Sequence, residues 1–526
     1  MTLARAVDCV AEIWAGKPGR TADVWAAFLL LVICAATVSI GAVHTHIFGH
    51  DIFIVYDAGW RVLNGQRPDV DFSPSMGPLL GLLAAAGLKL ARNSVSGVGY
   101  TSALVGAIAG ISGYALCQRR MAGVPAVLGA AVVTLIATAP FPIGWPPNTS
   151  SHAMVYNRYS YALLGVVVLE CFRPGAVTIF GGFSTGVISA ALLFLKPSFG
   201  LVAIGFALVC PALKHATGLL GGLAAGILAM MTYLHFNFGA VWNDFRLMSA
   251  AKGAGLSLWA IRWAFLRGLA DFLPIALLAL LVSLATATYR PLFWALIVYA
   301  AGALLLATNA QPNGFPLSAI LAILLAEHGR SAPGAVIRPM VLVLLCLVCW
   351  APELFSDASG LVYGFIETRN SPPDSEVARF REPHLANLLL YDLPDGTDAD
   401  LRSSGRVYVK YVNDGVDLIR RFSAPAETIF TLDMANPFPY ALLRKPAHGG
   451  SPALAFDHTF NDQHKPSTDW LFGAADIVMV PKHPASSKPD ADALFRNYLA
   501  DIRVEFVLCG ESDYWWLYKR ACANAP

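Results

Sequence analysis

Long apolar runs separated by short polar stretches fill the first two thirds of the chain. A helix needs about 20 mainly apolar residues to cross the hydrocarbon core of a bilayer. The pattern therefore predicts a polytopic α-helical membrane protein with about 11 transmembrane helices. The predicted spans are 24–43, 99–117, 124–141, 159–172, 178–195, 199–213, 218–236, 272–288, 292–308, 315–326 and 340–350.

The polar flanks of these runs predict the domain organisation and the orientation. We expect a cytoplasmic segment at 1–23 with no cleavable signal peptide, a transmembrane domain at 24–352, and an outer soluble domain at 353–526. With the N-terminus inside, every predicted inner loop contains Lys or Arg, as the positive-inside rule requires. The long first outer loop, 44–98, then holds a second short apolar run, 77–90, which we interpret as a helix in the outer interface.

The remainder, 353–526, has the pattern of a small α/β domain outside the cytoplasm. Residues 412–422 have helical spacing, and four short runs have the composition of strands: 428–432, 475–480, 503–508 and 514–518. The pair Trp515 and Trp516 fits a packed core or the interface better than a sugar site. Cys509 and Cys522 are the two cysteines of this polar tail, and one disulfide between them is an open alternative in an oxidising compartment.

Composition narrows the class of protein further. Hydrophobic residues make up 56% of the chain and charged residues only 14%, which argues against a soluble enzyme. The net charge of +2 lacks the basic stripe that a nucleic-acid partner needs. We therefore expect a multi-pass protein of the cytoplasmic membrane, with membrane lipids as partners and no nucleic acid.

Acidic residues are scarce in the membrane region and gather in one place. Only 11 of the 35 acidic residues precede Glu353, and four of these lie in the first outer loop. Carboxylates near hydrocarbon are costly, so a cluster at the membrane edge is a functional candidate. The four are Asp51, Asp57, Asp69 and Asp71.

Each of these acids also has a structural interpretation. The segment 51–63 is helical in pattern and ends at Asn64-Gly65, so Asp51 could be an N-cap. Asp57 and Arg61 have the spacing of an i,i+4 ion pair. The run Asp69-Val70-Asp71 alternates with strand period, which would let both carboxylates share a cation.

Candidate cations and polar groups occur at the outer ends of several spans. Lys196 lies in a tight outer turn, where it either binds an anion or snorkels. Arg158 is suited to bidentate phosphate recognition, with an interfacial anchor as the alternative. Asn157 and His152 could hold sugar hydroxyls. Gln311 belongs to a polar outer turn, 309–314, that either lines a site or is an ordinary turn.

An outer segment and a group of histidines are weaker functional candidates. The stretch 237–267 mixes charges with aromatic residues, and we interpret it as an outer amphipathic segment on the lipid. His44, His46 and His50 precede Asp51 and could bind a metal with it, although no metal-ligand spacing is present. No cofactor is indicated with certainty, and a divalent metal remains an alternative.

The first outer loop resembles that of the GT-C class of membrane glycosyltransferases, which includes aminoarabinose transferases and protein mannosyltransferases. In that class an Asp in the loop precedes a short helix, a Gly, a Pro and a second interfacial helix. Here the matching residues are Asp51, the stretch 56–68 with Gly65 and Pro68, and then Gly77-Pro78. Ile52 stands where the class often has a second acid, which leaves Asp57 and Asp71 as competitors.

The resemblance implies a glycosyltransferase that moves a sugar from a polyprenyl-phosphate donor to an envelope glycan or lipid acceptor. Asp51, Asp57 or Asp71 would act on the acceptor hydroxyl. Other polar groups would hold the substrates: Arg61, Asp69, His152, Asn157, Arg158, Lys196 and Gln311. Two alternatives are a carrier or flippase for lipid-linked sugars and a non-catalytic scaffold that binds them. Clustering of acids at one edge, with no repeated halves, favours the enzyme over the carrier.

Overall fold

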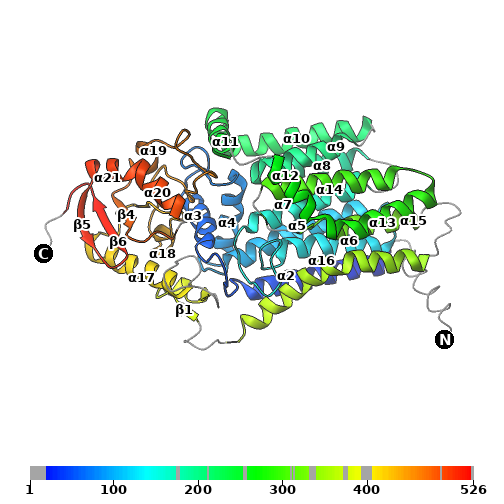
Figure 1. The fold of residues 1–526 in the computed structure, drawn as a ribbon, viewed down its shortest axis with the longest axis horizontal. Coiled ribbons are helices and arrows are strands. Elements are labelled where there is room, and N and C mark those ends of the chain that lie inside the picture. The colour runs from blue at the N-terminus through cyan, green and yellow to red at the C-terminus, as the bar shows by residue number, and fades with distance from the viewer. Residues whose placement is uncertain are drawn as a thin grey trace.

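The computed structural model describes residues 19–172, 178–209, 213–252, 258–308, 311, 314–330, 339–370, 377–392, 405–485 and 488–522. Over these residues the chain forms a long bundle of helices and a smaller α/β domain, and helices α3 and α4 lie between the two (Figure 1). The predicted architecture, a polytopic helical protein with a small C-terminal α/β domain, is confirmed.

One helix corresponds to each of the eleven predicted spans. Five of the helices, α2, α5, α10, α13 and α14, are long and apolar enough to cross a membrane. The protein is thus a multi-pass membrane protein. The eleven helices are α2 (Arg20–Ile40), α5 (Gly97–Cys117), α6 (Gly123–Thr138), α7 (Val155–Cys171), α8 (Ile179–Leu195), α9 (Pro197–Leu208), α10 (Leu213–Tyr233), α13 (Leu269–Thr286), α14 (Arg290–Thr308), α15 (Ser318–Arg330) and α16 (Pro339–Glu367).

Small residues allow two of these helices to pack unusually closely. A Cβ atom added at Gly186 of α8 would lie 2.3 Å from the carbonyl oxygen of Leu219, and one at Gly222 of α10 would lie 2.0 Å from that of Phe183. Close backbone approach of this kind is how helices associate where lipid offers no hydrophobic driving force. The seam between α8 and α10 therefore depends on glycine.

The last helix differs from its prediction. The span predicted to end at Trp350 continues through Pro352 to Glu367, so that α16 has 29 residues and the expected domain boundary at 352/353 falls inside it. Proline is tolerated within membrane helices when neighbouring groups satisfy the freed backbone. The polar residues after the apolar run do not end the helix, because an amphipathic helix can leave the membrane without a break.

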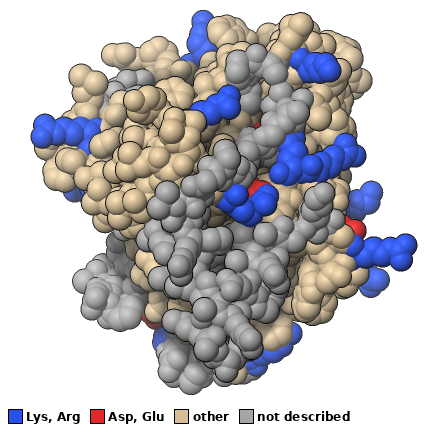
Figure 2. Space-filling view, turned by 90° about the vertical axis from the view of Figure 1, so that its right-hand side faces the viewer, with Lys and Arg blue, Asp and Glu red and all other residues tan. Residues whose placement is uncertain are grey.

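Basic side chains gather at the end of the bundle where α2 begins. Lys and Arg dominate the charged atoms of the described residues on this face, and few acids are visible (Figure 2). The helix order brings to this end Arg20, Arg119, Arg120, Arg290 and Arg330. The orientation with the N-terminus in the cytoplasm stays a prediction.

Four shorter helices lie outside the spans: α3 (Asp51–Leu63), α4 (Pro78–Leu90), α11 (Phe238–Lys252) and α12 (Leu258–Arg267). The predicted helix limits for α3 are confirmed, and Gly65 has a φ of +85°, as expected after a helix C-terminus. Trp242 and Trp259 of α11 and α12 are 65% and 62% exposed. Exposed tryptophan on short helices between spans is typical of segments that lie in a membrane interface.

The C-terminal domain is built on a four-stranded mixed sheet in the order β3-β4-β6-β5, in which only β3 and β4 are parallel. A separate hairpin-like pair, β1 and β2, is antiparallel. The elements are β1 (Val377–Arg379), η1 (Pro383–Leu385), β2 (Leu389–Tyr391), α17 (Gly405–Phe422), β3 (Ile429–Thr431), α18 (Phe438–Ala441), α19 (Thr468–Phe472), β4 (Ile477–Pro481), α20 (Lys488–Leu494), η2 (Phe495–Leu499), α21 (Ala500–Glu505), β5 (Val507–Glu511) and β6 (Trp515–Lys519).

Strand alternation divides the buried residues of this domain into two cores. Ile477 and Met479 face the core that contains α17, and Val478 and Val480 face the core that contains α20 and α21. Trp515 is fully buried beside α17, which supports the packing interpretation of that residue. The predicted strand 503–508 is partly wrong, because residues 503–505 end α21 and β5 begins at Val507.

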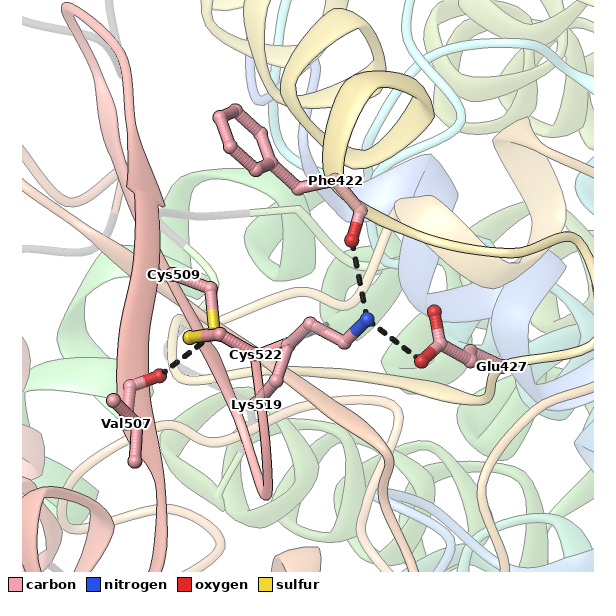
Figure 3. Close-up of a disulfide and its surroundings, with 6 residues drawn as sticks. All are labelled: Phe422, Glu427, Val507, Cys509, Lys519 and Cys522. Carbon is pink, nitrogen blue, oxygen red and sulfur yellow. Dashed lines mark hydrogen bonds and ion pairs between the residues drawn. A yellow bond between two sulfur atoms is a disulfide. The ribbon is translucent and has the colours of Figure 1, made fainter. Parts of the chain in front are cut away.

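A disulfide ties the outer edge of the sheet to the chain that follows β6. Cys509 of β5 and Cys522 are bonded, with their Cα atoms 5.5 Å apart (Figure 3). Nearby, Lys519 donates to the carbonyl oxygen of Phe422 at 3.1 Å and pairs with Glu427 at 2.7 Å. The structure therefore supports the disulfide between Cys509 and Cys522.

We expect the disulfide to stabilise the outer domain. A bond that closes a loop of this length contributes about 3 kcal/mol in the chain-entropy account. The Cys509→Ser/Cys522→Ser variant should therefore unfold at a lower temperature than the parent, as measured by a thermal scan of purified protein. Dithiothreitol should lower the parent's midpoint and leave that of the double variant unchanged; equal midpoints for both proteins under oxidising conditions would contradict the assignment.

Candidate active site

Hydrogen bonds join the first outer loop to the C-terminal domain at several points along the loop. Backbone and side-chain donors of the loop reach carbonyl oxygens of the domain at hydrogen-bonding distance, so the loop has one defined path. The bonds join Thr45 N to Leu389 O (2.8 Å), Trp60 Nε1 to Arg444 O (2.7 Å), Gln66 Nε2 to Pro446 O (3.0 Å) and Ser73 N to Gly450 O (2.9 Å).

Asp51 is the first residue of α3, and its side chain is 15% exposed. His50 occupies the N-cap position, so the interpretation of Asp51 as the N-cap is wrong. The His50 Nε2 atom lies 3.1 Å from Asp51 Oδ1. The carboxylate also interacts electrostatically with Tyr156 at the start of α7 and with Tyr408 of α17. Asp51 therefore lies where the loop, the bundle and the outer domain meet.

Lys196 lies in the extended turn between α8 and α9, directly before Pro197. Its ammonium group donates to Asn157 Oδ1 at 2.6 Å and lies 4.7 Å from the ring centroid of Tyr156. Lys196 is only 6% exposed, so it does not snorkel to open water. A buried ammonium on an aromatic face keeps its charge available to an anion at the same place.

Tyr156 is thus the common neighbour of the candidate acid and the candidate cation. It is half-buried, and the next residue, Asn157, is 1% exposed. Asn157 Oδ1 accepts from Lys196, whereas its buried Nδ2 has no hydrogen-bond partner among the described residues. That amide is a donor available to an oxygen of a substrate.

A glycine holds the first outer loop against the turn that contains Lys196. The Gly77 N–H donates to the carbonyl oxygen of Leu195 at 3.1 Å. A Cβ atom at Gly77 would lie 1.9 Å from the carbonyl oxygen of Phe194, so no other residue fits this contact. Pro78 then starts α4 at the position where its missing N–H costs nothing.

Gln311 borders the same region from another loop. The Tyr161 hydroxyl of α7 lies 3.5 Å from Gln311 Oε1, and the Tyr161 ring packs at 4.8 Å against Phe199, which also neighbours Lys196. The other polar residues of the predicted turn, Asn309 and Asn313, lie outside the described residues.

Asp57 and Arg61 form the predicted i,i+4 ion pair, with Arg61 Nε 2.8 Å from Asp57 Oδ2. Both side chains are fully buried, and Arg61 also donates to the carbonyl oxygens of Ala447 and Gly449. The pair therefore joins the loop to the outer domain. Catalysis by Asp57 and phosphate binding by Arg61 stay predictions; in the structure both groups are engaged at this junction.

The expected strand alternation at Asp69 and Asp71 is absent: Asp69 has a φ of +64°, and the segment is a turn. That the two carboxylates share a cation stays a prediction. Asp71 accepts from the Arg67 backbone N–H at 2.7 Å and pairs with its guanidinium. No group of three or more His, Cys, Asp and Glu residues in the described part of the chain could hold a metal ion.

Asp69 instead meets Asp244 of α11, whose side chain accepts from Ser73 Oγ at 3.1 Å. Burial and the neighbouring carboxylate raise the pKa of Asp69, and burial also raises the pKa of Asp244. Two buried carboxyls in contact share one proton. The pair lies beside a small cavity lined by Ser73, Pro74, Asp244, Leu247, Met248, Ser451, Leu454, Thr459 and Pro466.

His152 and Arg158 have structural partners. His152 is buried and its Nε2 accepts from the Val43 N–H at 3.1 Å, and burial lowers its pKa to about 4. Arg158 Nη1 pairs with Asp357 of α16 at 3.0 Å, and its Nε donates to the carbonyl oxygen of Phe141. Arg158 thus anchors α7 to α16, and the structure does not bring it together with Lys196.

Sequence reasoning missed three residues near these acids: Tyr408, Asp244 as the partner of Asp69, and Asp357 as the partner of Arg158. Asp244 is the one acid in the segment 237–267, which is rich in aromatic residues. An isolated acid in such a segment indicates that its side chain is buried for a reason. Tyr408 carried no signal, because its partners are more than three hundred residues earlier in the chain.

No family model matches the chain, and no curated protein matches it. Among solved structures it is similar to ArnT from Cupriavidus metallidurans in the apo state, with 14% identity, a TM-score of 0.38, and coverage of 95% of this chain and 98% of that one. It is also similar to the same protein bound to undecaprenyl phosphate, with 12% identity, a TM-score of 0.38, and coverage of 95% and 99%.

Removal of Arg61 should loosen the outer domain. The Arg61→Met variant leaves Asp57 buried without its cation, which typically costs about 3–5 kcal/mol. We expect a lower thermal midpoint and faster proteolysis of the C-terminal domain. The matched control is Arg67→Met, whose pair with Asp71 is partly exposed and contributes less than about 1 kcal/mol. If the two variants behaved alike, burial of the Asp57–Arg61 pair would not be what stabilises the junction.

The thermal stability of the folded protein should fall as pH rises, because the buried carboxyls of Asp69 and Asp244 lose their proton. Their pKa values are raised in the folded protein, so the contact is fully stabilising below the ordinary carboxyl pKa of about 4 and is lost as pH rises through the raised values. Between about pH 5 and about pH 9 the thermal midpoint of the parent should therefore drop more than that of Asp69→Asn. Parallel midpoint curves would show that no proton is shared.

Proposed function

We propose that the protein is a GT-C-type glycosyltransferase. It takes a sugar from a polyprenyl-phosphate donor and transfers it to a glycan or lipid acceptor on the outer face of the cytoplasmic membrane. The observation that carries the proposal is that Tyr156 is linked to both groups: its ring centroid lies 4.7 Å from the Lys196 ammonium group, and the Asp51 carboxylate acts electrostatically on its hydroxyl. A carboxylate and a cation next to the apolar bundle are the two groups that such a reaction needs.

Asp51 is proposed to act on the acceptor. Its carboxylate takes the proton of the acceptor hydroxyl while the hydroxyl oxygen bonds to the anomeric carbon of the donor sugar. The bond between that carbon and the phosphate oxygen breaks, and its electron pair leaves with the phosphate. The sugar passes through a state with oxocarbenium character, as in other glycosyl transfers.

Lys196 is proposed to stabilise the leaving phosphate. Negative charge grows on the phosphate as the bond breaks, and a preorganised cation in a poorly solvated site stabilises that charge strongly. The Asn157 amide, next to Lys196, supplies a second donor to the same group. The lipid tail would extend along the apolar helices from which Lys196 and Asn157 come.

Replacement of Asp51 and replacement of Lys196 should have different effects on kcat and donor KM. Purified protein is given a panel of polyprenyl-phosphate hexoses and pentoses together with lipid and glycan acceptors, and release of polyprenyl phosphate is measured. Asp51→Asn should lower kcat by about 10²–10⁴-fold with little change in donor KM, since a general base acts in the transition state. Lys196→Met should lower kcat by about 10²–10³-fold and raise donor KM, since the cation contacts the phosphate before and during the reaction.

Two controls accompany this experiment. Asp417→Asn removes an exposed carboxylate of α17, and Lys482→Met removes a lysine 5.8 Å from the Trp516 ring in the outer domain. Both should keep the parent's rates. Transfer that survives loss of Asp51, Asp57 and Asp71 together would end the proposal, and donor binding without any release in the parent would indicate a scaffold.

A further inference from the structure

His50 directly precedes the candidate catalytic acid, and the two side chains are in contact. The His50 Nε2 atom lies 3.1 Å from Asp51 Oδ1, which is within hydrogen-bonding range. Consecutive side chains on a helix do not normally face each other. Here His50 is the N-cap of α3 and Asp51 is its first residue, so the contact is a specific feature of the way in which this helix begins.

The two partners differ in how far they are exposed. The side chain of His50 is 3% exposed, whereas that of Asp51 is 15% exposed. The carboxylate is therefore the group that an acceptor hydroxyl can reach, and the imidazole lies behind it. An ionised carboxylate only accepts hydrogen bonds, so the imidazole nitrogen that faces it carries a hydrogen. His50 thus has the geometry of a donor that orients the acid.

Aromatic rings from two segments fix the orientation of the imidazole. The ring of Phe48, in the first outer loop, lies 6.5 Å from the His50 ring at an interplanar angle of 86°. The ring of Tyr408, in α17, lies 6.2 Å from it at 63°. Edge-to-face arrangements of this kind are the preferred geometry of neighbouring rings. The imidazole is therefore held by packing from both the loop and the outer domain.

The turn that leads into His50 has an unfavourable backbone conformation. Phe48 has a φ of +54°, in the left-handed region that bulky residues rarely adopt. Its carbonyl oxygen accepts from the Asp51 N–H at 3.0 Å, and its ring packs edge-to-face against Trp145 at 5.8 Å. Strain of this kind persists only where the surroundings impose it, and it is concentrated at functional sites. The strained turn determines the direction from which the chain enters the His50–Asp51 pair.

We propose that His50 is a positioning residue for the glycosyl transfer. Its Nε2–H holds Asp51 Oδ1, which leaves the second carboxylate oxygen directed at the acceptor hydroxyl. This inference rests on the proposed function. During the step the acceptor's proton moves to Asp51, the acceptor oxygen bonds to the anomeric carbon, and the phosphate leaves with the electron pair of the broken bond. His50 keeps its hydrogen throughout.

The test compares His50→Leu, which removes the donor, with His50→Gln, whose amide offers an N–H near the position of Nε2. In the polyprenyl-phosphate release assay, His50→Leu should lower kcat by about 10–100-fold, because a reacting group loses its orientation. The donor and acceptor KM should stay at the parent's values. His50→Gln should recover most of the lost kcat. A role in packing alone predicts the opposite order, because Leu suits aromatic surroundings better than Gln.

His384→Leu is the matched control. His384 is a half-buried histidine at another contact between the first outer loop and the outer domain, where its carbonyl oxygen accepts from the Val95 N–H at 3.1 Å. Its Nε2 lies 3.1 Å from the carbonyl oxygen of Tyr440 and contacts no candidate acid. This variant should keep the parent's kcat.

The remaining outcomes separate the inference from the proposed function. A His50→Leu variant with the parent's kcat, or a His50→Gln variant no more active than His50→Leu, would overturn the inference. The proposed function would stand in either case if Asp51→Asn is impaired in the same assay. A loss of kcat that follows a loss of thermal midpoint in both variants would also overturn the inference, because His50 would then be a packing residue. A parent that releases no polyprenyl phosphate from any donor would overturn the proposed function and this inference together.

Discussion

The fully buried ion pair between Asp57 and Arg61 is the constraint on which the arrangement of the two bodies depends. Taking two charges out of water is costly, and the cost is offset only when good geometry and further hydrogen bonds satisfy both groups. Here those further bonds go to carbonyl oxygens of Ala447 and Gly449 in the outer domain. These bonds form only when the loop and the domain lie together, so the pair joins the two bodies at this junction.

The candidate site follows from that junction. Asp51 comes from the first outer loop, Lys196 from the turn between α8 and α9, and Asn157 from the first turn of α7. Gly77 joins the loop to the turn before Lys196 by a backbone hydrogen bond. The candidate site thus combines one loop that packs on the outer domain with two segments of the bundle.

Much of the fold was predictable because its signals are local. Apolar runs long enough for a bilayer identified eleven helices, and the Asn64-Gly65 stop gave the end of α3. The errors have a common cause. Asp69 and Arg61 were read against neighbours a few residues away, whereas their decisive partners, Asp244 and the 447–449 carbonyls, are distant in sequence. Lys196 is a candidate from sequence because a lysine on the outer side needs a reason, but its partner Asn157 could be matched to it only by the packing of α7 against α8.

The length of α16 has a consequence for where the reaction takes place. At 1.5 Å per residue its 29 residues extend about 43 Å, some 13 Å more than the thickness of the hydrocarbon core. Its last residue, Glu367, pairs at 2.5 Å with His46 of the first outer loop. A continuous helix therefore joins the first outer loop to the bundle, and the depth of that loop relative to the lipid is tied to the position of α16.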